Sequence, residues 1–129
     1  MIKKLMCIIK NKLGYKRTSC INERVKLFTH TDLDGVGCAI LAYAVFGKKN
    51  VDVEYCDYND INEKVEMFYS SCIKFKYDRV YITDISVNDE VANIIEHYKG
   101  VAGSPKVLLL DHHQTALPLN DYSWAIVTP

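Results

Sequence analysis

Short apolar runs alternate with longer segments of helical spacing from Arg24 to the end of the chain. Apolar runs bounded by polar or glycine-containing turns are typical of strands, whereas apolar residues three or four positions apart are typical of helices with one buried face. This alternation predicts an α/β fold built on a mainly parallel sheet. Strands are predicted at 25–29, 51–56, 79–83, 106–110 and 124–127, and helices at 36–46, at 59–75 and from a cap at 88 or 89 to residue 98.

Two of the predicted strands differ in polarity. Residues 51–56 alternate apolar and polar side chains, as expected for a half-exposed strand. Residues 106–110 show almost no such alternation, which is typical of a parallel strand that is covered on both faces. We therefore expect residues 106–110 near the centre of the sheet.

The composition is that of one folded domain. The chain has 129 residues, of which 49% are hydrophobic and 25% charged, and it contains no run of about 20 apolar residues that would span a membrane. Its five cysteines include no C-x-x-C pair, so neither a disulfide framework nor a zinc knuckle is predicted. Reduced thiols and the lack of a signal peptide favour a cytoplasmic location.

Charge is unevenly distributed, although the formal net charge is zero. Residues 1–26 hold eight basic side chains and one acidic side chain. Within them, apolar residues at 2, 5, 6, 9 and 13 lie on one helical stripe, which predicts a basic amphipathic arm over residues 1–23. Such an arm usually docks on its own or a partner domain; contact with a membrane surface or nucleic acid is the alternative.

Acidic and imidazole side chains follow three of the predicted strands. His30, Asp32 and Asp34 follow the first strand, Asp84 follows the third, and the triplet Asp-His-His at 111–113 follows the fourth. Ligands of open α/β folds bind at the carboxyl ends of the strands. If these strands are neighbours in the sheet, the three clusters converge in space.

The chemistry of these clusters fits a divalent metal. Carboxylates crowded in a partly buried cleft repel one another unless a cation offsets their charge. Two imidazoles and three carboxylates suit Mn²⁺, Fe²⁺ or Zn²⁺ better than Mg²⁺ or Ca²⁺, and five side chains can hold two ions about 3.5–4 Å apart. The candidate ligands are His30, Asp32, Asp34, Asp84 and His112.

The spacing before Gly35 adds a geometric expectation. In an extended segment alternate side chains share a face, so His30, Asp32 and Asp34 are expected to point into one pocket. Gly35 would then permit a sharp turn into a helix whose first N–H groups face an incoming phosphate. Asp34-Gly35 alone is typical of an ordinary turn, and a lone aspartate after a strand is typical of a helix cap; the three clusters together favour a metal site.

In these motifs the chain resembles the DHH phosphoesterase family, which is named for its Asp-His-His triplet. Residues 29–35 are similar to the first motif of that family, 83–84 to the second and 109–113 to the third. The resemblance implies a three-layer α/β/α, Rossmann-like DHH domain over residues 24–129. It also implies a Mn²⁺-dependent phosphoesterase or phosphodiesterase, because the family includes RecJ-type exonucleases, oligoribonucleases and cyclic-dinucleotide phosphodiesterases.

The resemblance also implies a ligand set for two ions. His30 and Asp32 would hold one ion, Asp34 and His112 would hold the other, and Asp84 would bridge them. Mn²⁺ is the expected metal, with Mg²⁺, Fe²⁺ or Co²⁺ as alternatives.

Catalytic and substrate-binding roles come from the same resemblance. Asp111 would orient His112 through the ring N–H of that histidine. His113 would contact the scissile phosphate or protonate the leaving oxygen, and Gly35 would lie with His113 against the substrate.

The chain departs from the family after the triplet. The family places a fourth aspartate-bearing motif and a C-terminal substrate-binding domain beyond it, whereas sixteen residues follow His113 here. We therefore expect this chain to correspond to the N-terminal part of a DHH enzyme, either as a fragment or as a natural short form. Its expected partners are further copies of the chain or the missing C-terminal domain.

Three functions follow from these observations. The first is an enzyme that hydrolyses phosphodiester or phosphoanhydride bonds of nucleic acid, oligonucleotide or cyclic dinucleotide. The second is a non-catalytic module that binds metal or nucleotide or depends on a partner, and the third is a structural domain recruited through its basic arm. The tyrosines, Tyr55 and Tyr58 among them, are predicted at core and surface positions rather than as a stacking platform.

Overall fold

The computed structural model describes residues 22–129, so the predicted basic arm lies outside the described residues except for its last two. No helix within residues 22–129 is both long enough and apolar enough to cross a membrane. The strands are β1 (Val25–His30), β2 (Val51–Cys56), β3 (Arg79–Thr83), β4 (Lys106–Asp111) and β5 (Ala125–Val127); the α-helices are α2 (Leu33–Phe46), α3 (Ile61–Ser70) and α4 (Asp89–Tyr98); the 3₁₀ helices are η1 (Lys48–Asn50), η2 (Cys72–Lys76) and η3 (Gln114–Asp121).

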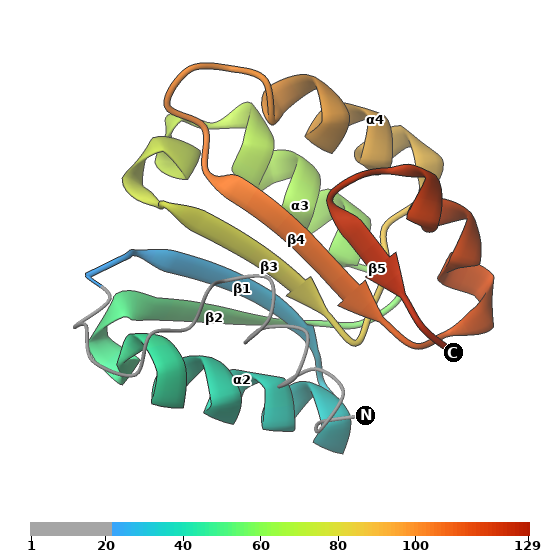
Figure 1. Cartoon of the computed structure of the whole chain (residues 1–129), viewed down its shortest axis with the longest axis horizontal. Helices are drawn as coiled ribbons and strands as arrows, with labels where there is room; N and C mark the ends of the chain where they lie inside the picture. Colours follow the sequence, from blue (N-terminus) through green and yellow to red (C-terminus); the bar gives the residue numbers. More distant parts are fainter. Residues whose placement is uncertain (1–21) are drawn as a thin grey trace.

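The five strands form one sheet in the order β2-β1-β3-β4-β5, and every neighbouring pair is parallel. Parallel neighbours require crossover connections, which the helices between the strands supply. Figure 1 shows α2 on one face of the sheet and α3 and α4 on the other. The predicted three-layer α/β/α, Rossmann-like architecture is therefore confirmed.

Each face of the sheet has its own apolar core. Because successive side chains of a strand point to opposite faces, Leu27 packs toward α2 whereas Phe28 packs toward α3 and α4. In β4 the same alternation sends Leu108 and Leu110 to the first core and Leu109 to the second, and all three are buried. The continuous apolar run of β4 thus reflects a strand that is covered on both sides.

Strand β4 lies directly beside the central strand β3, so the expectation that residues 106–110 lie near the centre of the sheet is confirmed.

The structure corrects several element boundaries. Helix α2 begins at Leu33, before the predicted start at residue 36. The predicted helix 59–75 is divided at Ser71, whose extended backbone ends α3 and whose hydroxyl accepts a hydrogen bond from the Ile73 N–H at the start of η2. Helix η3 was not predicted, and Pro118 lies within it.

The carboxyl ends of β1, β3 and β4 lie side by side. These strands are consecutive neighbours in the sheet, and the register pairs Thr29 with Thr83 and Thr83 with Leu110. His30, Asp84 and Asp111 directly follow these paired residues, so they lie together at the carboxyl-terminal end of the sheet. The expectation that the three polar clusters converge is confirmed.

Candidate metal centre

Two buried threonines join the strand ends beneath the polar cluster. The Thr83 hydroxyl donates a hydrogen bond to Oγ1 of Thr29 (2.9 Å). The Thr29 hydroxyl in turn donates to the backbone carbonyl of Gly35 (3.0 Å) in the first turn of α2. Since buried hydroxyls are stable only when they are paired, these bonds fix the ends of β1 and β3 against the start of α2.

Gly35 permits a close approach between α2 and β1. A Cβ atom at this position would lie 1.8 Å from the backbone oxygen of His30, which is far inside van der Waals contact. Only glycine fits here.

The predicted extended geometry of residues 30–34 is wrong, because Asp32 is the N-cap of α2 and Asp34 and Gly35 are helical. The N–H of Gly35 donates to Oδ1 of Asp32 (2.9 Å), so it is not a free donor for phosphate.

Asp84 is held in a strained backbone conformation at the centre of the cluster. Its φ of 61° is the one positive value among the non-glycine residues of the described part of the chain, and its side chain is fully buried. Its backbone N–H donates to the carbonyl of Leu110 (3.0 Å), which ties it to β4. Strain of this kind persists where the surrounding structure enforces it, and it concentrates at functional sites.

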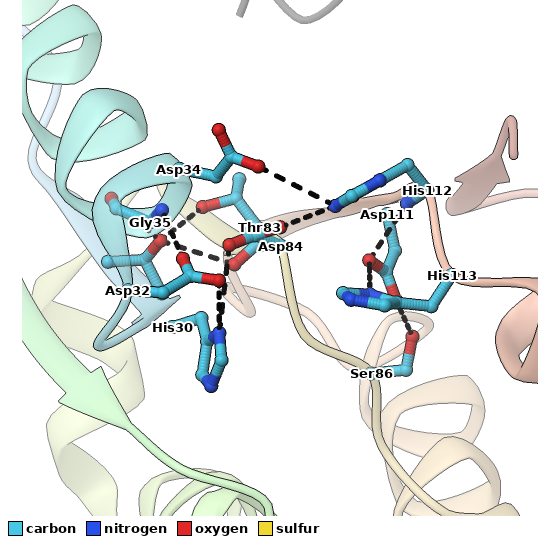
Figure 2. A network of polar contacts seen from close by, with 11 residues as sticks. His30, Asp32, Asp34, Gly35, Thr83, Asp84, Ser86, Asp111, His112 and His113 are labelled. Carbon is cyan, nitrogen blue, oxygen red and sulfur yellow. Dashed lines mark hydrogen bonds and ion pairs between the residues drawn. The ribbon is translucent and has the colours of Figure 1, made fainter. Parts of the chain in front are cut away.

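The two carboxylate oxygens of Asp84 face two different histidines, as Figure 2 shows. Oδ1 lies 2.8 Å from Nε2 of His112, and Oδ2 lies 3.8 Å from Nδ1 of His30. Asp32 lies on the side of His30, with its Oδ2 2.9 Å from Nδ1 of that ring. Asp34 lies on the side of His112, with its Oδ2 4.0 Å from Nε2. The structure thus brings together all five predicted metal ligands and places Asp84 between the two pairs.

Two buried polar atoms on the side of His30 lack a well-formed hydrogen bond in the described part of the chain, although Asp32 lies 2.9 Å from one of them. Within residues 22–129, neither Nδ1 of His30 nor Oδ2 of Asp84 forms a hydrogen bond of acceptable geometry. Leaving such atoms unpaired destabilises a protein by about 1–3 kcal/mol each, so native structures rarely retain them without a ligand. His30, Asp32 and Asp84 also bring one ligand atom each within 4.8 Å of one another, which fits a metal ion.

The charges of the cluster are strongly coupled. Burial, together with the neighbouring Asp32 carboxylate, raises the pKa of Asp84 to about 6. The neighbouring Asp84 side chain is the largest cause that lowers the pKa of Asp32 to about 2. At neutral pH both groups therefore carry negative charge at close range, one of them fully buried, and a cation would offset this repulsion.

Asp111 contacts His113 rather than the ring of His112. Its Oδ1 lies 2.6 Å from Nδ1 of His113 and accepts the backbone N–H of His112 (2.8 Å), while its Oδ2 accepts the Ser86 hydroxyl (2.5 Å). The expectation that Asp111 orients the ring of His112 is wrong in this structure, because that ring turns toward Asp84. Instead, Asp111 holds the ring of His113 in place and leaves Nε2 of that ring outside the contact (Figure 2).

Two residues at this end of the sheet were not expected in the site: Ser86, and Tyr58, which was predicted at an ordinary core or surface position. Ser86 carries no distinguishing motif, so no local signal identified it. Tyr58 has its ring centroid 4.9 Å from that of His30 and 6.4 Å from that of His113. It follows β2, the neighbour of β1, so the rule that functional residues gather at strand ends would have placed it here.

The chain is similar to oligoribonuclease NrnB from Bacillus subtilis (strain 168), with 41% identity over 102 residues. The matched region covers 78% of this chain and 25% of the relative, so the chain spans about a quarter of the length of the curated relative it matches. No family model and no solved structure matches the chain. The similarity agrees with the resemblance carried by the three motifs.

Proposed function

Because the chain belongs to the DHH phosphoesterase family, we propose that it hydrolyses phosphodiester bonds of short nucleic acids with two divalent cations, Mn²⁺ in the first place. The observation that carries the proposal is the position of Asp84, whose two carboxylate oxygens face His30 and His112. The relative is named an oligoribonuclease, which supports short RNA as the substrate. Cyclic dinucleotides are the second class of substrate to test.

In this proposal, Asp84 would contribute to both ion sites. His30 and Asp32 would hold one ion with it, and Asp34 and His112 would hold the other. Divalent cations supply Lewis acidity, which offsets the charge of the phosphate and lowers the pKa of water. The mixed imidazole and carboxylate donors suit Mn²⁺, with Fe²⁺, Co²⁺ and Mg²⁺ as the alternatives.

His113 has the geometry of a proton donor to the leaving oxygen. Its Nδ1 is paired with Asp111, so the ring is fixed in orientation and Nε2 is the nitrogen that contacts substrate. Ser86 holds the second oxygen of Asp111 and thereby limits rotation of that carboxylate. Asp111 and Ser86 act here as positioning residues.

The experiment that tests the proposal compares wild-type protein with the Asp84→Asn variant. Asparagine matches the size of aspartate and tolerates positive φ, so the variant should fold. Native mass spectrometry with Mn²⁺ should show two ions on the wild type and fewer on the variant. Hydrolysis of a diribonucleotide should fall by about 1,000-fold or more, since the variant loses a charge shared by both sites.

Asp121→Asn is the matched control, because Asp121 is an exposed aspartate at the end of η3 and the substitution also removes one carboxylate. It should keep both the ion count and the turnover. Wild-type protein that shows no metal-dependent hydrolysis of linear or cyclic dinucleotides would contradict the proposal. Ion binding without hydrolysis would favour a non-catalytic metal-binding module instead.

A further inference from the structure

A pocket of about 480 Å³ adjoins the metal centre on the side of His113. This volume lies within the range of about 300–1,000 Å³ that is typical of small-molecule sites. Asp111 and His113 form the wall that the pocket shares with the metal centre, and the rest comes from Tyr58, residues 86–88, the first residues of α3 and α4, and part of η3. A molecule bound in the pocket would therefore lie next to the phosphate in the proposed reaction.

The lining of this pocket suits an uncharged ligand. Apolar side chains such as Val87 and Leu119 alternate with the neutral polar side chains of Asn62 and Thr115. Among the described residues, no lysine or arginine lines the pocket, whereas the carboxylates of Asp89 and Asp111 do. A second phosphate group would meet negative charge there without a basic partner.

The start of α4, one of the two helix ends at the pocket, is already compensated. Oδ1 of Asn88 accepts the N–H of Val91 (2.9 Å) and caps α4, and Asp89 and Glu90 place two acidic side chains in the first turn. The partial positive charge of this helix end is therefore offset by the protein itself. This arrangement leaves little attraction for an anion and favours a base with its ribose.

Tyr58 supplies an aromatic surface at the mouth of the pocket. Its side chain is 61% exposed although its ring approaches both His30 and His113. An exposed tyrosine ring at a nucleic-acid site offers a face on which a base can stack. Tyr58 therefore lies between His30 of the metal centre and His113 of the pocket wall, next to both sites.

We propose that this pocket binds the nucleoside of the nucleotide whose phosphate lies at the metal centre, with the base stacked on Tyr58. The inference rests on the proposed function and extends it, because it gives the substrate class a specificity site. The NH₂ group of Asn62, whose Oδ1 already accepts the Asn88 N–H (2.7 Å), and the hydroxyl of Thr115 provide the polar contacts for the base and ribose. The enzyme would thus discriminate nucleotides from other phosphate esters within the described domain.

The test measures binding rather than turnover. Isothermal titration calorimetry of the full chain with Mn²⁺ compares 5′-AMP, ribose 5-phosphate and inorganic phosphate. The variants are Tyr58→Ala, Tyr58→Phe and, as a matched control, Tyr55→Ala, since Tyr55 is an exposed tyrosine on the edge strand β2 that does not line the pocket. Circular dichroism checks that each variant is folded.

Wild-type protein should bind 5′-AMP about 10-fold or more tightly than ribose 5-phosphate, as expected for one stacked base. Tyr58→Ala should remove this preference without changing the affinity for ribose 5-phosphate, whereas Tyr58→Phe and Tyr55→Ala should keep it. Equal affinity for the three ligands, or an unchanged preference in Tyr58→Ala, would overturn the inference.

A hydrolysis assay separates this inference from the proposed function. In one outcome, the wild type hydrolyses a diribonucleotide and yet binds 5′-AMP and ribose 5-phosphate with equal affinity. That result would overturn the nucleoside pocket and leave the proposed function in place. A preference for 5′-AMP that depends on Tyr58, in a protein that hydrolyses no dinucleotide, would support the pocket and overturn the proposed function.

Discussion

The two sides of Asp84 differ in how fully their polar atoms are paired. On the side of His30, Nδ1 of that ring and Oδ2 of Asp84 are buried and form no hydrogen bond of good geometry with any residue in 22–129, although Oδ2 of Asp32 lies 2.9 Å from Nδ1. On the side of Asp111, both carboxylate oxygens accept hydrogen bonds, from Ser86, from His113 and from the backbone of His112. Both regions lie at the same sheet edge, so the difference does not come from depth in the fold.

This difference indicates that the two regions have different functions. His30, Asp32 and Asp84 bring one ligand atom each within 4.8 Å of one another, and two of their buried atoms lack a well-formed hydrogen bond among the described residues, so we infer that the side of His30 binds a cation. A fully paired network holds one side chain in one orientation, so the side of Asp111 is built to position His113. The following predictions test whether this division holds.

The largest effect is expected from Gly35→Ala, which disturbs both sides. The added methyl group would meet the backbone oxygen of His30, and no side-chain rotation relieves a clash with backbone. We expect a loss of about 3 kcal/mol or more in the free energy of unfolding, measured by urea denaturation. Gly100→Ala is the control, because its Cβ would lie 3.9 Å from the nearest atom. Equal stability of the two variants would show that α2 does not need this close approach.

Asp111→Asn should separate positioning from metal binding. It removes the charge that holds Nδ1 of His113 but none of the five proposed ligands. We expect kcat for a dinucleotide to fall by roughly 100-fold, within the range usual for a mispositioned general acid, while native mass spectrometry still counts two Mn²⁺ ions. Loss of an ion in this variant would mean that the side of Asp111 also binds metal.

Asp84→Asn should stabilise the metal-free protein at neutral pH. The pKa of Asp84 is raised to about 6 from 3.8, so the folded state holds this proton more tightly than the unfolded state does. The stability of the metal-free wild type therefore falls as the pH rises from about 4 to about 6 and stays lower above that window. With a chelator present, we expect the variant to be about 3 kcal/mol more stable than the wild type at pH 7.5 and nearly equally stable at pH 4.

The contribution of Asp32 has the opposite sign. Its pKa is lowered to about 2, so the stability it provides is present above about pH 4 and is lost as the pH falls toward 2. This range lies below the pH window set by Asp84.

Saturating Mn²⁺ should make the wild type more stable than Asp84→Asn, because a ligand that binds the native state stabilises it. A wild type that remains more stable than Asp84→Asn in chelator at pH 7.5 would show that Asp84 is already satisfied without a cation.

The smallest effect is expected from Ser86→Ala. This change removes one of the hydrogen bonds to Asp111 and leaves the contacts with His113 and His112 in place. We expect a loss of about 1 kcal/mol in the free energy of unfolding and a several-fold decrease in kcat with an unchanged KM. A change in the number of bound ions would argue against a role confined to positioning.

Much of the fold could be predicted from local patterns. Five strands and the helices between them lie close to their expected positions, because apolar runs and helical periodicity report directly on which faces are buried. Boundaries were less predictable, since the early start of α2 depends on the cap formed by Asp32 and the division after α3 depends on Ser71. The order β2-β1-β3-β4-β5 was needed to show that the three polar clusters meet.

The sequence by itself determined the βα alternation and the metal-compatible residues at three strand ends. Only the tertiary structure decided that Asp84 faces two histidines, that Asp111 pairs with His113, and that Tyr58 stands beside the pocket. The physical reason is that burial repeats with the period of each element and is therefore visible along the chain. The direction of a side chain at a strand end depends instead on one backbone angle, such as the φ of 61° at Asp84, and on neighbours brought in from distant strands.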